Sequence, residues 1–162
     1  MCKVKGCTFC KSGKNHYCKV CENTDSTHYS SMCPVKNAAI LLFVKNKIVV
    51  VRDINSGKWM LPGGKIDAGE SAWNSSVREY YEETGYHLPN EGFEYNYYDK
   101  KHQGGRYTRI YIGKTDLGCP RYKKTNETNA LKCETLHNIL NRDKHEYVGY
   151  VIKSLQEIFD LM

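Results

Sequence analysis

Two hydrophobic runs stand close together near the start of the longer, C-terminal part of the chain. Residues 38–44 (AAILLFV) are apolar throughout, and residues 48–51 (IVVV) repeat the pattern after a polar tripeptide at 45–47. Runs of this length, rich in β-branched residues and joined by a short polar turn, are typical of paired strands. The pattern therefore predicts a buried β-hairpin at residues 38–51.

A helical period follows the hairpin. Large apolar residues recur there at i, i+4 and i+7, and so form one stripe on a helix that can pack on a sheet. These residues are Trp73, Val77 and Tyr80. Gly85 fits the left-handed C-cap position, and the glycine pair at 63–64 allows a tight turn close to a ligand. We predict a strand, a glycine turn, a loop and then this helix.

The rest of the chain alternates between strand-like and helix-like patterns. Residues 92–98 and 107–113 show β-type alternation around a loop at 102–105. Residues 131–140 and 147–159 are expected to be helical, and the second has a continuous apolar face. The apolar face of the second helix is expected to pack in the core rather than to form a groove for a partner.

Carboxylates crowd one face of the helix predicted within residues 64–86. Glu79, Glu82 and Glu83 are spaced i, i+3 and i+4, and side chains at this spacing share a face. Because like charges repel, such a group indicates a bound cation, and oxygen ligands suit Mg²⁺ or Mn²⁺. Arg78 can aim one of these carboxylates, and Glu70 lies near the positive end of the helix dipole.

This arrangement resembles the Nudix box: Gly, five residues, Glu, seven residues, Arg-Glu, two residues, Glu-Glu, one residue, Gly. The fixed positions are filled by Gly64, Glu70, Arg78, Glu79, Glu82, Glu83 and Gly85. Tyr80 and Tyr86 replace the two residues that are usually aliphatic. The resemblance covers about residues 35–160. It implies an α/β fold, an α/β/α sandwich around a mixed sheet, and hydrolysis of a nucleoside diphosphate linked to another group.

The resemblance also implies roles for individual residues. Glu79, Glu82 and Glu83 would bind Mg²⁺ or Mn²⁺, with the Gly63 carbonyl as a further ligand. Arg78 would orient the glutamates, and Glu70 would support the site. The ion would neutralise the pyrophosphate and lower the pKa of the attacking water. The residues expected to act in catalysis are Glu70, Arg78, Glu82, Glu83 and Glu127.

Glu127 is included because many Nudix enzymes use a further glutamate from a loop beyond the box. Its surroundings, Lys-Thr-Asn-Glu at residues 124–127, resemble the mRNA-decapping branch of the family. Cys133 stands where the family often has Trp. Glu134 is the second candidate for this base or ligand, and a surface glutamate without a role is the alternative.

Residues 1–33 differ from the rest because they hold six of the eight cysteines and two histidines, but no apolar period. Such a stretch cannot build a core and needs a cross-link. Two Cys-x-x-Cys pairs in an intracellular chain favour zinc over disulfides. We predict two domains: a zinc-binding module at 1–33 and a Nudix domain at 34–162.

The eight candidate zinc ligands divide into two sets of four. The preferred sets are Cys18, Cys21, His28 and Cys33, which resembles a zinc knuckle, and Cys2, Cys7, Cys10 and His16. A single site that leaves Cys2 and His16 unused is the alternative. Knuckles contact single-stranded nucleic acid, but they also serve as scaffolds or bind proteins, and the sequence does not distinguish these roles. The remaining cysteines stand apart, and Cys133 is expected to be a small core residue.

The chain carries a net charge of +6, and residues 100–124 are notably basic. Lysines and arginines beside tyrosines suit phosphate contact and base stacking. The candidate substrate-binding residues are Lys100, Lys101, Arg106, Tyr107, Arg109, Lys123 and Lys124. The alternative is an edge hairpin whose lysines deter aggregation.

The sequence lacks an apolar stretch of the roughly 18–20 residues that span a bilayer, and its first residues lack a signal-peptide core. We expect a cytoplasmic protein that does not bind membranes, of undetermined oligomeric state. The predicted function is Mg²⁺- or Mn²⁺-dependent hydrolysis of a capped or 5′-modified RNA end. The alternatives are a small nucleotide or inositol pyrophosphate substrate, or a non-enzymatic zinc-finger module that binds RNA.

Overall fold

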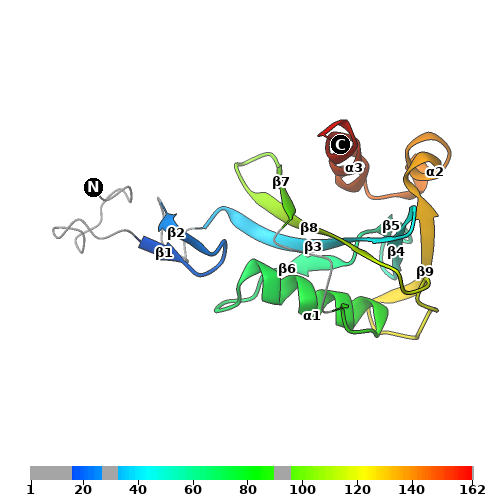
Figure 1. The fold of residues 1–162 in the computed structure, drawn as a ribbon, viewed down its shortest axis with the longest axis horizontal. Helices are drawn as coiled ribbons and strands as arrows, with labels where there is room; N and C mark the ends of the chain where they lie inside the picture. The colour runs from blue at the N-terminus through cyan, green and yellow to red at the C-terminus, as the bar shows by residue number, and fades with distance from the viewer. Residues whose placement is uncertain (1–15, 27–32, 90–95, 162) are drawn as a thin grey trace.

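The computed structural model describes residues 16–26, 33–89 and 96–161, and its main feature is a seven-stranded mixed sheet (Figure 1). Its strands are β3 (Val35–Val44), β4 (Lys47–Asp53), β5 (Trp59–Met60), β6 (Gly63–Lys65), β7 (Tyr97–Lys101), β8 (Tyr107–Thr115) and β9 (Thr128–Thr135). The α-helices are α1 (Ala72–Thr84), α2 (Leu136–Asn141) and α3 (Gly149–Leu161), with a 3-10 turn at Lys144–Glu146. A two-stranded sheet, β1 (His16–Cys18) and β2 (Asn23–Ser26), precedes them.

Strand β3 is the centre of the sheet. It pairs antiparallel with β4 and β6, and parallel with β8 along its length. Ile40, Leu41 and Leu42 in its middle are at most 2% exposed. Strands buried on both faces are continuously apolar, which explains the run at residues 38–44. The predicted hairpin with β4 is confirmed.

The helices cover both faces of the sheet, with α1 on one side and α2 and α3 on the other (Figure 1). Because alternate residues of a strand point to opposite faces, Ile40 packs in the cluster that contains Tyr80 of α1. Its neighbour Leu41 packs with Val151 and Leu155 of α3. The α/β/α sandwich is thus confirmed. Among the described residues, no helix is long and apolar enough to cross a membrane.

Strand β9 corrects the helix expected at residues 131–140. Residues 128–135 pair antiparallel with β4, with Val51 opposite Leu131 and Val49 opposite Cys133. Helix α2 starts only at Leu136, where the Thr135 side chain accepts a hydrogen bond from the Asn138 amide. An apolar stretch this short is compatible with either structure, and the edge of β4 supplies backbone partners that decide for a strand.

Two cysteines in the C-terminal part of the chain are joined rather than separate. Cys119 and Cys133 form a disulfide with their Cα atoms 6.0 Å apart. The prediction that these two cysteines stand alone is wrong, although Cys133 packs against the hydrophobic core as expected. The two residues are 14 apart in sequence, and Cys133 lies in the second half of β9. The bond closes the loop that carries Glu127.

Candidate active site

The glycine turn brings the backbone of β6 beneath helix α1. Gly63 and Gly64 pair with Ala39 and Ala38 of β3, and the Gly63 amide donates a 3.2 Å hydrogen bond to Oε2 of Glu83. A Cβ atom at Gly64 would lie 2.6 Å from Cδ of Glu79. Only glycine leaves room here for the Glu79 carboxylate, so the turn shapes the acidic site.

Hydrogen-bonded caps stabilise both ends of helix α1. The Ser71 hydroxyl accepts a hydrogen bond from the Asn74 amide, which caps the N-terminus. Gly85 adopts a left-handed conformation with φ of 79°, and its amide donates to the Tyr81 carbonyl. The predicted C-cap is confirmed. These caps fix where the helix begins and ends, and therefore which residues face the sheet.

Three carboxylates converge between α1 and the loop before β9. Oxygens of Glu79, Glu83 and Glu127 all lie within 4.8 Å of one another. Glu79 and Glu83 are buried and Glu127 is exposed. Burial, reinforced by the neighbouring carboxylates, raises the pKa of Glu83 to about 9 even though the Gly63 amide opposes this shift. Burial also raises the pKa of Glu79.

The donor set fits a hard divalent cation. Like charges this close in a poorly solvated site repel, and an ion with two positive charges relieves that repulsion. Carboxylate oxygens are the ligands that Mg²⁺ and Mn²⁺ prefer. Residues Glu79, Glu83 and Glu127 could therefore hold such an ion. The sequence places Glu82 in the same set, but its carboxylate lies outside this group of three.

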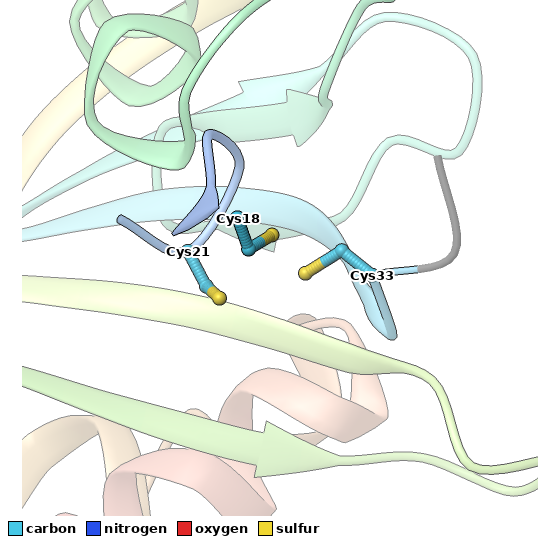
Figure 2. Close-up of side chains that lie close together, drawn as sticks. All are labelled: Cys18, Cys21 and Cys33. Carbon is cyan, nitrogen blue, oxygen red and sulfur yellow. The ribbon is translucent and has the colours of Figure 1, made fainter. Parts of the chain in front are cut away.

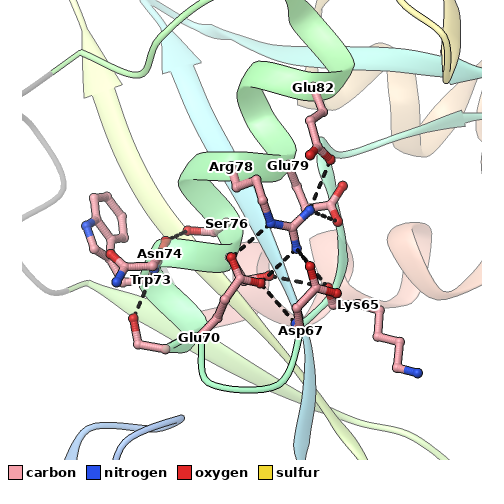
Figure 3. Close-up of polar contacts among 11 residues, drawn as sticks. Lys65, Asp67, Glu70, Trp73, Asn74, Ser76, Arg78, Glu79 and Glu82 are labelled. Carbon is pink, nitrogen blue, oxygen red and sulfur yellow. Dashed lines mark hydrogen bonds and ion pairs between the residues drawn. The ribbon is translucent and has the colours of Figure 1, made fainter.

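Arg78 links the other acidic residues of the box (Figure 3). Its Nε and Nη2 atoms each donate to Glu70 at 2.9 Å. Nη1 donates to Glu79 at 3.1 Å and to Glu82 at 3.0 Å. The hydrogen bonds from Arg78 lower the pKa of Glu70. Arg78 thus has the geometry of a residue that orients Glu79, while Glu70 fixes the guanidinium.

The segment before β9 is tied to α1, which places Glu127 at the site. The Thr128 hydroxyl donates to the backbone carbonyl of Glu83 at 2.6 Å. Thr125 braces this hydroxyl at 2.8 Å. The second candidate, Glu134, is elsewhere: it accepts hydrogen bonds from the Thr135 amide and the Asn138 side chain at the start of α2. The structure therefore brings Glu127, and not Glu134, to the carboxylates.

A pocket of about 540 Å³ opens beside the site. Its lining residues are Asn37, Ala38, Gly64, His102, Gln103, Arg106, Thr108 and Tyr150. Gly64 is shared with the carboxylate site, and the charge of Glu83, after burial, helps to raise the pKa of Tyr150 to about 12. The rings of Tyr150 and His102 meet edge to face, with centroids 5.5 Å apart. The pocket therefore places aromatic rings next to the carboxylates.

Arg106 is the one predicted substrate residue in this pocket. Two others have structural roles that sequence could not reveal. Arg109 is 6% exposed and donates to both oxygens of Asp99 at 2.8 and 2.9 Å. Lys100 forms an ion pair with Glu157 at 2.5 Å. The prediction that Arg109 binds substrate is therefore wrong, because its charge is already paired with Asp99 inside the protein.

The remaining predicted substrate residues lie away from the pocket lining. Lys123 stands over the ring of Tyr86, with Nζ 3.9 Å from the centroid. Tyr107 begins β8 and is half-buried. The side chains of Lys101 and Lys124 are exposed. The basic segment is thus divided between internal ion pairs, the pocket and the open surface.

Sequence reasoning missed most of the pocket. His102 belongs to the turn between β7 and β8, and Tyr150 to the first turn of α3. His102 was placed only in a loop, and Tyr150 fell inside an apolar helical pattern. The signal that could have found His102 is its position before Gly104 and Gly105, whose positive φ angles form the tight turn.

Three of the predicted zinc ligands lie together. Sulfur atoms of Cys18, Cys21 and Cys33 are all within 4.8 Å of one another (Figure 2). Cys18 and Cys33 are buried. Of the other predicted ligands, Cys2, Cys7, Cys10 and His28 lie outside the described residues, and the side chain of His16 is also not described. The preferred set is therefore assembled for its three cysteines.

Comparisons with known proteins agree with this geometry. The model of the NUDIX domain matches residues 34–154. Over 50 residues the chain is 40% identical to the uncharacterized Nudix hydrolase YvcI of Bacillus subtilis, and over 84 residues it is 32% identical to the m7GpppN-mRNA hydrolase of Saccharomyces cerevisiae. These stretches are 31% and 52% of this chain, but 32% and 9% of the relatives. This chain thus spans about a third of the first relative's length.

Solved structures of other proteins share this fold. An Ap4A hydrolase from C. elegans superposes with a TM-score of 0.62 at 16% identity, over 78% of this chain and 97% of that one. At this identity the match concerns the fold alone. The family match covers most of the chain and includes the whole carboxylate arrangement. The chain therefore belongs to the Nudix family.

Proposed function

We propose that this Nudix hydrolase cleaves the diphosphate linkage at a capped or otherwise 5′-modified RNA end and releases a nucleoside diphosphate. The observation that carries the proposal is the similarity over 84 residues, about half of this chain, to the yeast m7GpppN-mRNA hydrolase. The proposal is also supported by the position of Glu127, whose surroundings in sequence suggest the decapping branch and whose carboxylate meets Glu79 and Glu83.

Nudix hydrolases generally use Mg²⁺ or Mn²⁺. Here Glu79, Glu83 and Glu127 would hold the ion, and we propose Glu82 and the Gly63 carbonyl as further ligands. When bound, the ion supplies charge neutralisation of the diphosphate and a lower pKa for the attacking water. Arg78 keeps Glu79 oriented through its ion pair. Glu127 is the exposed member of the three, so it is the carboxylate best placed to accept a proton from water.

The pocket would take the nucleoside that leaves with the diphosphate. Burial lowers the pKa of His102, and the charges of Lys100 and Arg106 lower it further, which favours the neutral imidazole. A neutral ring beside Tyr150 offers an apolar surface on which a base can stack. Arg106 can donate to phosphate oxygens. These three residues account for a base and a phosphate next to the carboxylates.

A small nucleotide substrate is the second candidate, and one observation favours it. The pocket volume of about 540 Å³ lies within the range of small-molecule sites, and much of the basic segment is used in internal contacts. An inositol pyrophosphate is less well matched, because Arg106 is the single Lys or Arg among the described lining residues.

The deciding experiment compares a capped RNA of a few tens of nucleotides with the free cap dinucleotide, at low and moderate salt. For RNA, we expect higher kcat/KM than for the dinucleotide and a release of nucleoside diphosphate. Affinity for the RNA should fall with salt by a slope of about −0.7 for each neutralised phosphate. Equal rates on both substrates, with no salt dependence beyond that of the dinucleotide, would contradict RNA and leave the small nucleotide.

Point variants test the pocket better than a truncation. Deleting residues 1–33 would uncover the core, since Cys18 and Cys33 are at most 1% exposed within it. Arg106→Ala should raise KM for capped RNA, whereas Arg142→Ala at the end of α2 should not. If both variants behave as the wild type, Arg106 does not contact the substrate. We further propose that residues 1–33 bind RNA or a protein partner, and that the enzyme is cytoplasmic.

A further inference from the structure

The cysteine group near the N-terminus is far from the proposed chemistry, yet its sulfur atoms point toward one another. Figure 2 shows Cys18 at the end of β1, Cys21 on the turn that follows, and Cys33 just before β3. Sulfurs from all three lie within 4.8 Å. Among the described residues the structure records one disulfide, between Cys119 and Cys133, and none within this group. Three cysteine sulfurs that converge from two segments are the arrangement of a thiolate metal site.

The backbone of the same turn contacts the catalytic domain at two points. The Val20 carbonyl accepts a 2.8 Å hydrogen bond from the amide of Ala72, the first residue of α1. The Cys21 carbonyl accepts a 2.9 Å hydrogen bond from Nη1 of Arg109 in β8. The first amides of a helix lack partners within the helix, so Val20 completes the start of the helix that carries Glu79 and Glu83.

We propose that Cys18, Cys21 and Cys33 bind a zinc ion that fastens this turn to α1 and β8. Thiolate ligands select zinc among the common divalent ions, which separates this site from the carboxylate site. The described part of the module, residues 16–26, has two short strands, and short strands alone are not stable in water. The ion cross-links the module, and the hydrogen bonds of Val20 and Cys21 connect the module to the catalytic domain.

Three neutral thiols that pack in the core without a metal are the competing explanation, because buried cysteine also behaves as a small apolar residue. Metal analysis of the full chain, purified without added zinc, separates the two. Replacing Cys33 by Ser should lower the zinc content by about one equivalent. The double variant Cys119→Ser/Cys133→Ser is the matched control and should keep the zinc content of the wild type.

Cobalt gives a readout that does not depend on the variant folding. Wild-type protein exchanged into Co²⁺ should show sulfur-to-cobalt charge-transfer absorption, which Mg²⁺ sites built from carboxylates do not produce. Hydrogen exchange tests the fastening: in Cys33→Ser, the Ala72 amide should exchange roughly fivefold faster or more, as expected for the loss of one hydrogen bond. Wild-type zinc content in Cys33→Ser, or a wild type with neither zinc nor the cobalt absorption, would overturn the proposal.

Discussion

Arg78 donates two parallel hydrogen bonds to Glu70, from Nε to Oε2 and from Nη2 to Oε1, both 2.9 Å long. This geometry needs the planar fork of a guanidinium. The third nitrogen, Nη1, is thereby aimed at Glu79 and Glu82. Glu70 therefore acts on the carboxylate site through Arg78, although it is not one of the three converging glutamates.

Replacing Arg78 by Lys keeps the charge but removes the fork. We expect turnover to fall by about 10- to 100-fold, the usual effect of losing a group that orients a metal ligand. The fold should persist, because Arg78 is partly exposed. Steady-state kinetics at saturating Mg²⁺ measures the effect. Arg142→Lys is the matched control, and equal loss in both variants would show that Arg78 has no special role.

Glu82 and Glu83 should differ although they are neighbours. Glu83→Gln removes a buried carboxylate from the group of three, and should cost at least ~100-fold in turnover. Glu82→Gln removes a carboxylate that is exposed and paired with Arg78, so its loss should be smaller. Metal titrations should rank the variants in the same order. Near-wild-type rates for both variants would contradict the metal assignment of the box.

Glu127 and Glu134 provide a matched pair. Glu127→Gln should lower turnover by about 100-fold or more, as expected for a general base, with the loss in kcat rather than KM. Glu134→Gln should leave kcat unchanged, because its carboxylate bonds Thr135 and Asn138 at the start of α2. A loss of thermal stability is expected there instead. The opposite pattern in kcat would transfer the role to Glu134.

Alanine at the two glycines of the turn should have separate effects. At Gly64, the new Cβ would meet the carboxylate of Glu79, a movable group, so metal affinity should fall while the fold persists. At Gly63, it would lie 2.5 Å from the Ala38 carbonyl and 2.7 Å from Cα of Ala39, so folding should suffer. Thermal melting and Mg²⁺ titration distinguish these outcomes, and similar melting temperatures would contradict the contrast.

The stability of the protein should depend on Glu70 in acid. Hydrogen bonds from Arg78 hold its pKa below the ordinary value of about 4.3. A lowered pKa in the folded state adds stability above the unfolded pKa, and this stability is lost as the pH falls through the folded value. The difference in melting temperature between the wild type and Glu70→Gln should therefore shrink below about pH 4. A constant difference from pH 3 to 6 would show that the ion pair contributes nothing.

Local patterns predicted the box helix and its neighbours because their signals lie in short stretches of sequence. Gly85 caps α1 and residues 38–44 lie in strand β3, as expected. The start of β9 could not be predicted, since an eight-residue stretch becomes a strand only when β4 offers its edge. The decision depends on contacts about 80 residues apart in sequence.

The pocket and the basic segment show the same limit for side chains. Whether an arginine is free for substrate depends on which acid folds against it. Asp99 lies opposite Arg109 in the β7–β8 pair, so Arg109 is satisfied internally, whereas Arg106 in the turn lines the pocket. Tyr150 joins the pocket from the first turn of α3, far along the chain from Arg106. Sequence spacing carries neither relationship.

The Cys119–Cys133 disulfide has a consequence for chain entropy. Glu127 belongs to the ring that this bond closes. A ring of about 15 residues lowers the conformational entropy of the unfolded chain, which stabilises the folded state by roughly 3 kcal/mol. The disulfide therefore restricts the positions that the exposed Glu127 carboxylate can take relative to the buried carboxylates of Glu79 and Glu83. When the disulfide is reduced, the loop regains this conformational freedom. The fraction of molecules in which Glu127 lies beside Glu79 and Glu83 then depends on whether the surroundings oxidise or reduce the two thiols.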